Sequence, residues 1–247
     1  MSPARPRIVV PDLDRASTAA LRRMLDAGNV VLDCQAVLAK SGDNVVNELL
    51  RDQGTFFEWE HYPKDDVFDR DTQAQYYYHA HPPGERNFPE HGHFHTFLRP
   101  KGMPAGIRPL RLPGYKPPKD RNDALSHLVA ISMDTAGRPV RLFTTNRWVT
   151  GETWYTARDV IAMLDRFAIG HARPSWPANR WISAMLRLFR PQIVALLRQR
   201  DAAIAAWKTK HPRRNVYEDR DLEVTSIVAI SPEAQIAAAR RALAKRA

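Results

Sequence analysis

The chain has 247 residues, 44% of them hydrophobic, which is enough to bury a sizeable core. Its 37 lysines and arginines outnumber its 27 aspartates and glutamates, and the net charge of +10 attracts acidic or phosphorylated molecules. These cations are spread along the chain and form no specific nucleic-acid-binding motif. The single cysteine, Cys34, excludes an intramolecular disulfide and a zinc site built from cysteines.

The N-terminal sequence MSPARPRIVV lacks the apolar core of a signal peptide, and no apolar run is long enough to span a bilayer. We therefore expect a cytoplasmic protein without a transmembrane segment. Residues 1–12 are predicted to form an N-terminal arm, and residues 1–247 a single domain.

Short helices are predicted to follow the arm. Apolar residues recur at helical spacing from Leu13 to Leu38, and Gly28 marks a break that divides the segment into two helices. Asp43 is expected to cap a further short helix.

An aromatic run from Phe56 to Tyr62 is predicted to be a strand that stops at Pro63. The acidic segment after it lacks the glycine and the spacing of a calcium-binding loop. A solvated turn with Asx-type hydrogen bonds is therefore expected at its four carboxylates, Asp65, Asp66, Asp69 and Asp71.

The richest chemistry lies in residues 76–100, which hold five of the nine histidines. The alternation of this stretch predicts two strands, Gln75–His81 and Gly92–Leu98, joined by the loop Pro82–Glu90. An antiparallel hairpin centred on that loop would bring histidines of both strands to one face of the sheet, because side chains alternate between faces.

Four histidines meet in this predicted hairpin. His81 lies opposite His93 and His79 lies opposite His95, with the Cβ atoms of each pair about 5 Å apart. A register slipped by one residue would send the two pairs to opposite faces. The convergence of the four side chains therefore depends on the parity of the strands.

Four imidazoles on one patch favour a metal site. Neutral imidazole is a common ligand of zinc and iron, so a divalent transition metal (Zn, Fe or Mn) is the expected cofactor, bound by His79, His81, His93 and His95. A catalytic metal keeps one position for water or substrate, which indicates a metal-dependent enzyme acting on a small molecule, with acidic and phosphorylated compounds as candidate substrates.

Several residues beside these ligands are candidates for the chemistry. The predicted catalytic residues are His93, Glu90 and Arg99, where Arg99 would orient an acidic substrate. Glu85 in the connecting loop is a second candidate carboxylate ligand.

A long surface loop or arm is predicted from Arg99 to Asp123, because its six prolines forbid a regular helix or a central strand. A second hairpin is predicted from the strands His127–Asp134 and Val140–Asn146. Because His127 shares a face with Val129, Ile131 and Met133 in this alternation, it is a candidate for the sheet surface of the histidine cluster.

The last third of the chain is predicted to be mainly helical. A capping box at Thr156-x-x-Asp159 opens a helix that ends at Gly170, and a later helical stretch is interrupted near Pro191. The strand Leu222–Ile230 and a helix capped by Ser231 complete the chain. The order of elements predicts an α+β fold: a mostly antiparallel sheet carries the histidine-rich hairpin, and helices pack on one side.

Part of the hairpin resembles the first metal-binding motif of the cupins, at His79-Ala-His81-Pro-Pro-Gly-Glu85 with Gly92 following. The resemblance implies two histidines and a glutamate around iron, manganese or zinc inside a β-barrel. The sequence departs from it where Gln73 replaces an expected glycine, and the second cupin motif is missing after residue 100.

The second strand, His91-Gly-His93-Phe-His95-Thr-Phe97, is similar to the histidine-triad motif of nucleotide hydrolases and transferases. This resemblance implies that His93 attacks an α-phosphate and forms a covalent phosphoramidate. Gly92 and Thr96 stand where that family places apolar residues, and the motif gives no role to the histidines of the first strand.

The run from His61 through Gln75 to Arg99, together with residues 146–152, also resembles an uncharacterised bacterial family of unknown function. This similarity covers most of the chain and implies no activity. A non-catalytic protein, in which the histidines serve structure or bind metal without turnover, is a further alternative.

Overall fold

Six strands form one antiparallel sheet within the residues that the computed structural model describes, which are 8–82, 84 and 88–246. Consecutive strands pair with each other, so the order across the sheet follows the order along the chain. The strands are β1 (Tyr62–Phe68), β2 (Ala74–His79), β3 (Gly92–Leu98), β4 (Ser126–Met133), β5 (Pro139–Thr145) and β6 (Val224–Ala229).

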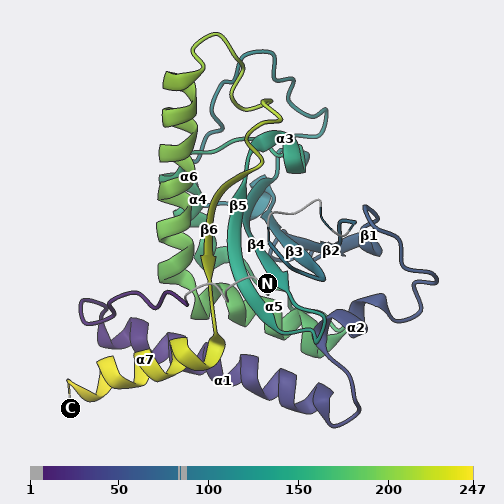
Figure 1. The fold of residues 1–247 in the computed structure, drawn as a ribbon, viewed down its shortest axis with the longest axis vertical. Helices are drawn as coiled ribbons and strands as arrows, with labels where there is room; N and C mark the ends of the chain where they lie inside the picture. Colours follow the sequence, from purple (N-terminus) through teal and green to yellow (C-terminus); the bar gives the residue numbers. More distant parts are fainter. Residues whose placement is uncertain (1–7, 83, 85–87, 247) are drawn as a thin grey trace.

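Helices surround one side and one end of this sheet. In Figure 1, α6 runs along β5 and β6, whereas α1 and α7 pack together across the bottom of the view. The helices are α1 (Thr18–Ala39), α2 (Val45–Leu50), α3 (Arg147–Thr150), α4 (Ala157–Met163), α5 (Trp176–Leu188), α6 (Arg190–Lys210) and α7 (Pro232–Ala244). The predicted α+β class is confirmed.

One face of the sheet packs on the helices. The ring of Phe94 on β3 lies 5.5 Å from that of Trp181 on α5, and the hydroxyl of Tyr76 donates to Asn179 Oδ1 at 2.6 Å. Val129 and Ile131 of β4 are fully buried in the same core. Alternation along the strands sends the neighbouring side chains, including the histidines, to the other face.

The first helix is one continuous element, and the break predicted at Gly28 is wrong. A Cβ atom at Gly28 would lie 2.5 Å from Cγ1 of Ile236, because α7 crosses α1 closely at this point. Gly28 therefore serves close packing of two helices, and the 22-residue helix tolerates its low helix propensity.

The predicted cap of α2 is shifted by one residue. Asn44, and not Asp43, accepts hydrogen bonds from the backbone amides of Val46 and Asn47, while Asp43 pairs with Arg51. The caps predicted later in the chain are confirmed: Thr156 caps α4 and Ser231 caps α7. The helix α4 ends at Met163 and continues as a 3₁₀ turn, Leu164–Arg166, short of the predicted end at Gly170.

The strand predicted before Pro63 is displaced. Residues 56–61 are irregular, and β1 begins at Tyr62 and includes Asp65 and Asp66, both with positive φ at an irregularity in its pairing with β2. The Asx-type turn is confirmed at Asp69, whose carboxylate accepts from three backbone amides, those of Asp71, Thr72 and Gly170. The Asp69 side chain is buried, whereas Arg70 and Asp71 in the turn are exposed.

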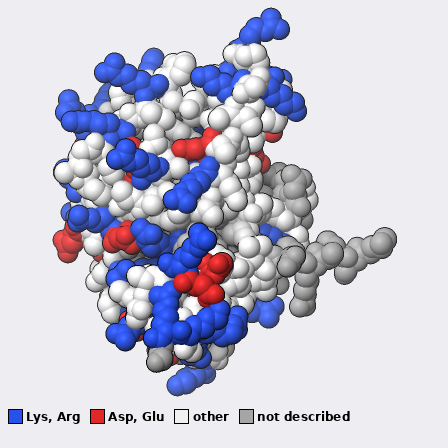
Figure 2. Space-filling model, turned by 90° about the vertical axis from the view of Figure 1, so that its left-hand side faces the viewer, with Lys and Arg blue, Asp and Glu red and all other residues white. Residues whose placement is uncertain are grey.

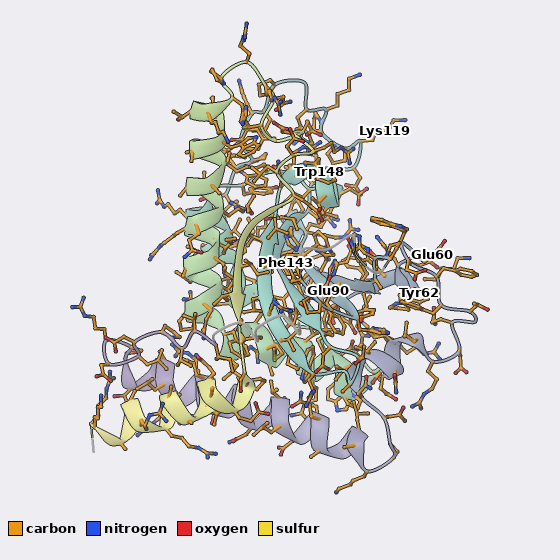
Figure 3. All side chains as sticks on the ribbon, viewed as in Figure 1. Glu60, Tyr62, Glu90, Lys119, Phe143 and Trp148 are labelled. Carbon is orange, nitrogen blue, oxygen red and sulfur yellow. The ribbon has the colours of Figure 1, made fainter. Side chains whose placement is uncertain are left out.

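The Pro-rich segment from Arg99 to Asp123 is irregular apart from two 3₁₀ turns, Pro100–Gly102 and Arg121–Asp123, as predicted. Arg99 binds Asp123 and so ties the two ends of the segment together. Lys119, which belongs to this segment, lies near the edge of the molecule in Figure 3. Of the helices in the described part of the chain, none has both the length and the apolar sequence that crossing a membrane requires.

Candidate metal centre

The histidine hairpin forms with a register two residues away from the predicted one. His79 lies opposite His93 and Tyr77 lies opposite His95, so the predicted pairs His81–His93 and His79–His95 are wrong. A shift of two residues preserves the face of every side chain. The histidines of both strands therefore still lie on one face, which is the face opposite the helical core.

Local chemistry explains the register. Pro82 and the proline after it lack the N–H that a ladder requires, and β2 ends at His79, three residues before Pro82. At the start of β3, a Cβ on Gly92 would lie 2.5 Å from both the carbonyl oxygen of His79 and the hydroxyl of Tyr78. Glycine thus permits the close approach that sets His79 opposite His93.

Three histidines converge on this face: His79, His93 and His95, called here the three-histidine centre. Each offers one ring nitrogen, and these nitrogens lie within 4.8 Å of one another. His79 is 8% exposed, and the other two are fully buried. Two strands contribute the three rings, because β3 supplies two of them at alternate positions.

A carboxylate orients His93 from behind. Nδ1 of His93 lies 2.8 Å from Glu90 Oε1, so Nδ1 carries the proton and donates it to the carboxylate. Nε2 of His93 therefore keeps its lone pair. Nε2 of His93 faces Nε2 of His79 at 2.7 Å. Two nitrogens bound to one tetrahedral zinc ion at about 2.0–2.1 Å lie about 3.3 Å apart, so a small separation of the rings would admit a metal.

A fourth histidine supports His95. Nδ1 of His95 lies 3.0 Å from Nε2 of His127. Burial, with a smaller effect of the nearby Arg200 cation, lowers the pKa of His127 to about 3, so His127 is neutral at physiological pH. When His95 donates from Nδ1 to this neutral ring, its own Nε2 is the nitrogen available for a metal.

A buried carboxylate lies behind His127. The backbone N–H of His127 donates to Glu152 Oε2 at 2.7 Å. Burial raises the pKa of Glu152 to about 7, although the neighbouring Arg200 and Arg147 cations and this hydrogen bond act in the opposite direction. The centre is thus backed by polar groups on two sides, through Glu90 and through His127.

A bulge in β4 places His127 on the histidine face. Thr96 lies opposite Val129, but the next pair joins Phe97 to His127, so Leu128 is an extra residue in the strand. The predicted common face of His127 with Val129, Ile131 and Met133 is therefore wrong. The expected position of His127 beside the cluster is correct, and the bulge is the reason.

Two further histidines, His61 and His81, flank the centre and are called the rim histidines. The ring of His81 lies 5.0 Å from that of His79 and 5.3 Å from that of His93, outside the group of three that could share one ion. His61 stacks on Tyr77 at 3.6 Å and binds Asp66 through Nδ1 at 3.0 Å. Burial keeps the pKa of Tyr77 well above its usual value, with Asp66 and Glu152 contributing.

An aromatic residue packs against the rim histidine His81. The ring of Trp59 packs edge-on against that of His81 at 4.2 Å, and the backbone N–H of Trp59 donates to the carbonyl of Ala80 at 3.0 Å. Its φ of 71° is uncommon for so bulky a residue, and its side chain is among the large exposed apolar groups, at 57% exposure. Trp59 is thus held against His81 in a backbone conformation that costs energy.

The other predicted site residues fall in different places. Arg99 is six residues from His93 along the strand, roughly 20 Å away, where it binds Gln75 and Asp123. The structure therefore does not bring Arg99 to the centre, whereas it does bring Glu90. Glu85 lies outside the described residues. His91 faces the helical side, where its Nδ1 lies 2.6 Å from the hydroxyl of Tyr78.

His61 is also a candidate from the sequence to complete or support the ligand set, but its contact with Asp66 and the position of Trp59 are not predicted. The contact of His61 with Asp66 crosses an irregular strand, and no motif connects the two residues. The position of Trp59 depends on a left-handed backbone that the sequence does not signal. The sequence signal for His61 is its position directly after the exposed acidic and aromatic residues 57–60.

A family described as a domain of unknown function (DUF6969) matches residues 25–230, a span that holds all six strands and the three-histidine centre. The expected similarity to an uncharacterised family is thereby confirmed. No curated protein and no solved structure matched the sequence.

Proposed function

The chain belongs to the DUF6969 family, whose description names no activity, and we propose from the site itself that the protein binds one divalent transition-metal ion at His79, His93 and His95. The observation that carries this proposal is the convergence of three buried ring nitrogens within 4.8 Å. One cation can accept the lone pairs of three imidazoles at once.

The donor set indicates which metals suit the site. Three imidazoles without a thiolate or a described carboxylate ligand favour Zn²⁺ or Fe²⁺ over Mg²⁺ or Ca²⁺, which prefer oxygen. The hydrogen bonds on the far nitrogens of His93 and His95 are the outer contacts that usually fix metal-binding imidazoles. We rank zinc first, then iron and manganese.

We further propose that the metal is catalytic. Three protein ligands leave a fourth position for water or substrate, which is the arrangement of hydrolytic zinc sites, whereas structural zinc sites use four protein ligands. Tyr77, whose ring lies 5.2 Å from that of His95, stays protonated and can donate a hydrogen bond to a bound small molecule. Glu90 orients His93 and is a positioning residue for this chemistry.

The nucleotide alternative is less well supported by the geometry. A histidine that attacks phosphorus must present an accessible Nε2, but Nε2 of His93 faces His79 at 2.7 Å inside a buried cluster. The cupin alternative assigns His81 as a ligand, and His81 lies outside the group of three. A cupin also requires a β-barrel, whereas the described residues form one open sheet with the strand order β1-β2-β3-β4-β5-β6.

Metal analysis of the purified protein tests the proposal. We expect about one zinc, iron or manganese ion per chain by elemental mass spectrometry, lost on dialysis against a chelator and regained on adding metal. Binding should weaken at acidic pH, because a protonated imidazole has no lone pair for a metal ion.

The control is the His171→Gln variant, since His171 lies on the helical side, where its carbonyl accepts from Asn179. It should retain one ion per chain. A wild-type protein that binds none of Zn, Fe, Mn, Co, Ni or Cu at micromolar concentration contradicts the proposal.

A further inference from the structure

Solvent exposure falls in steps from the rim histidines to the centre. The side chain of His61 is 44% exposed and His81 is partly exposed. His79 is 8% exposed, and His93 and His95 are fully buried. The five rings therefore form a graded series from solvent to the interior of the protein.

Neighbouring rings in this series are closely spaced. The centroid of His61 lies 5.8 Å from that of His79, and His81 lies 5.0 Å from His79 and 5.3 Å from His93. Rings inside the centre are separated by similar distances, 4.5 Å for His79–His93 and 4.7 Å for His93–His95. A cation held by one imidazole can reach the next without returning to water.

The structure holds His61 in a suitable orientation. Its Nδ1 binds Asp66 and its ring stacks on Tyr77, so Nε2 is the nitrogen through which it can bind a cation. Asp66 also accepts from the side chain of Gln75 at 2.6 Å, which fixes the carboxylate in turn. His61 is therefore oriented at the surface in the same way as the inner ligands, by a partner on its far nitrogen.

The surface around the rim is acidic in a protein of net charge +10. Residues 58–66 carry four carboxylates and one lysine, and Glu60 lies at the margin of the molecule beside β1 (Figure 3). Lysines and arginines are spread instead over the side formed by α6 (Figure 2). Local negative charge raises the concentration of cations at the rim. The carboxylates are Glu58, Glu60, Asp65 and Asp66, and the lysine is Lys64.

We infer that His61 and His81 are an entry route for a divalent metal ion, which passes from the rim to the three-histidine centre by successive ligand exchange. This inference rests on the proposed metal binding at His79, His93 and His95. It gives the rim histidines a kinetic role, in contrast to the prediction from sequence that His81 is a permanent ligand.

Substitution of a residue on the entry route and substitution of a permanent ligand have different effects on the rates and the affinity of metal binding. A residue on the route lowers the barrier in both directions, so its loss slows association and dissociation together and leaves the dissociation constant unchanged. Loss of a permanent ligand instead speeds dissociation and weakens the equilibrium affinity.

The test compares the wild type with His61→Gln, His81→Gln and the double variant. Association of Zn²⁺ with the chelator-treated full chain is followed by stopped flow with a fluorescent zinc indicator, and affinity is measured by competition with a chelator. We expect the double variant to associate at least 10-fold more slowly, with an affinity within 3-fold of the wild type. Glutamine keeps a polar side chain at both positions, and His171→Gln is the matched control for a histidine on the helical side.

Two outcomes overturn the inference. Unchanged association rates in the double variant would show that the ion enters elsewhere, and a 10-fold or greater loss of affinity in His81→Gln would make His81 a permanent ligand. Failure of the proposed function itself is distinct, because the wild-type chain would then bind no Zn²⁺ at all.

Discussion

Replacing His93 by alanine is expected to abolish stoichiometric metal binding. His93 supplies the central donor of the centre, since it faces His79 and is adjacent on the same face to His95. Removing a direct ligand should weaken binding by more than the 10–100-fold that loss of an outer partner causes. Titration of each variant with Zn²⁺ in competition with a chelator measures this effect, and His79→Ala and His95→Ala should behave alike.

The control for this series is His171→Ala, which should bind as the wild type does. Because alanine leaves a cavity in a buried cluster, thermal unfolding of each metal-free variant shows whether the fold is retained. Undiminished binding in His93→Ala would contradict the assignment. A labelled nucleotide that forms a covalent adduct in the presence of chelator, lost only in His93→Ala, would support the histidine-triad alternative instead.

Replacing Glu90 by glutamine is expected to weaken metal binding about 10–100-fold without abolishing it. The amide oxygen of glutamine can still accept the hydrogen bond from His93 Nδ1, so the ring keeps its orientation. The negative charge that makes the imidazole a better donor is lost. The same competition titration measures the change in affinity.

The matched control is Glu233→Gln, since Glu233 is an exposed acid in the first turn of α7. It should leave the affinity unchanged. Complete loss of binding in Glu90→Gln, equal to that of His93→Ala, would contradict the outer position of Glu90 and make it a direct ligand. Unchanged affinity would contradict any role for it in the centre.

Strand parity was the part of the site that the sequence could predict. The alternation of His93, His95 and Phe97 in a seven-residue strand sets which side chains share a face, whatever the partner strand does. The strand β3 has the predicted bounds, Gly92–Leu98. Because the register error was two residues, the convergence of histidines from both strands survived it.

Register itself depends on contacts that a single sequence does not display. The prediction centred the hairpin on its loop, but the end of β2 at His79 and the close approach at Gly92 decide the pairing. His81 consequently lies beyond the end of the β2–β3 pairing, at the rim of the centre. The bulge at Leu128 is a comparable case, because alternation alone would have sent His127 to the helical face.

The helical core was predictable in outline for a similar reason. Caps such as Ser231 are local signals, read from neighbouring residues, and they were confirmed. The break predicted at Gly28 is wrong because the role of this glycine is a close contact with Ile236, more than 200 residues away in sequence. Local sequence patterns therefore predicted the helices and strands. Tertiary contacts determined that α1 is continuous and which histidines form the three-histidine centre.

X-ray absorption spectroscopy of the zinc-loaded protein tests the central claim most directly, because it reports the atoms bound to the metal. We expect three imidazole nitrogens at about 2.0–2.1 Å and one further light-atom ligand. The His93→Ala protein should lose this spectrum, while the His171→Ala protein should keep it. A shell made only of oxygen atoms, or one that keeps its imidazole count in His93→Ala, would contradict a centre formed by His79, His93 and His95.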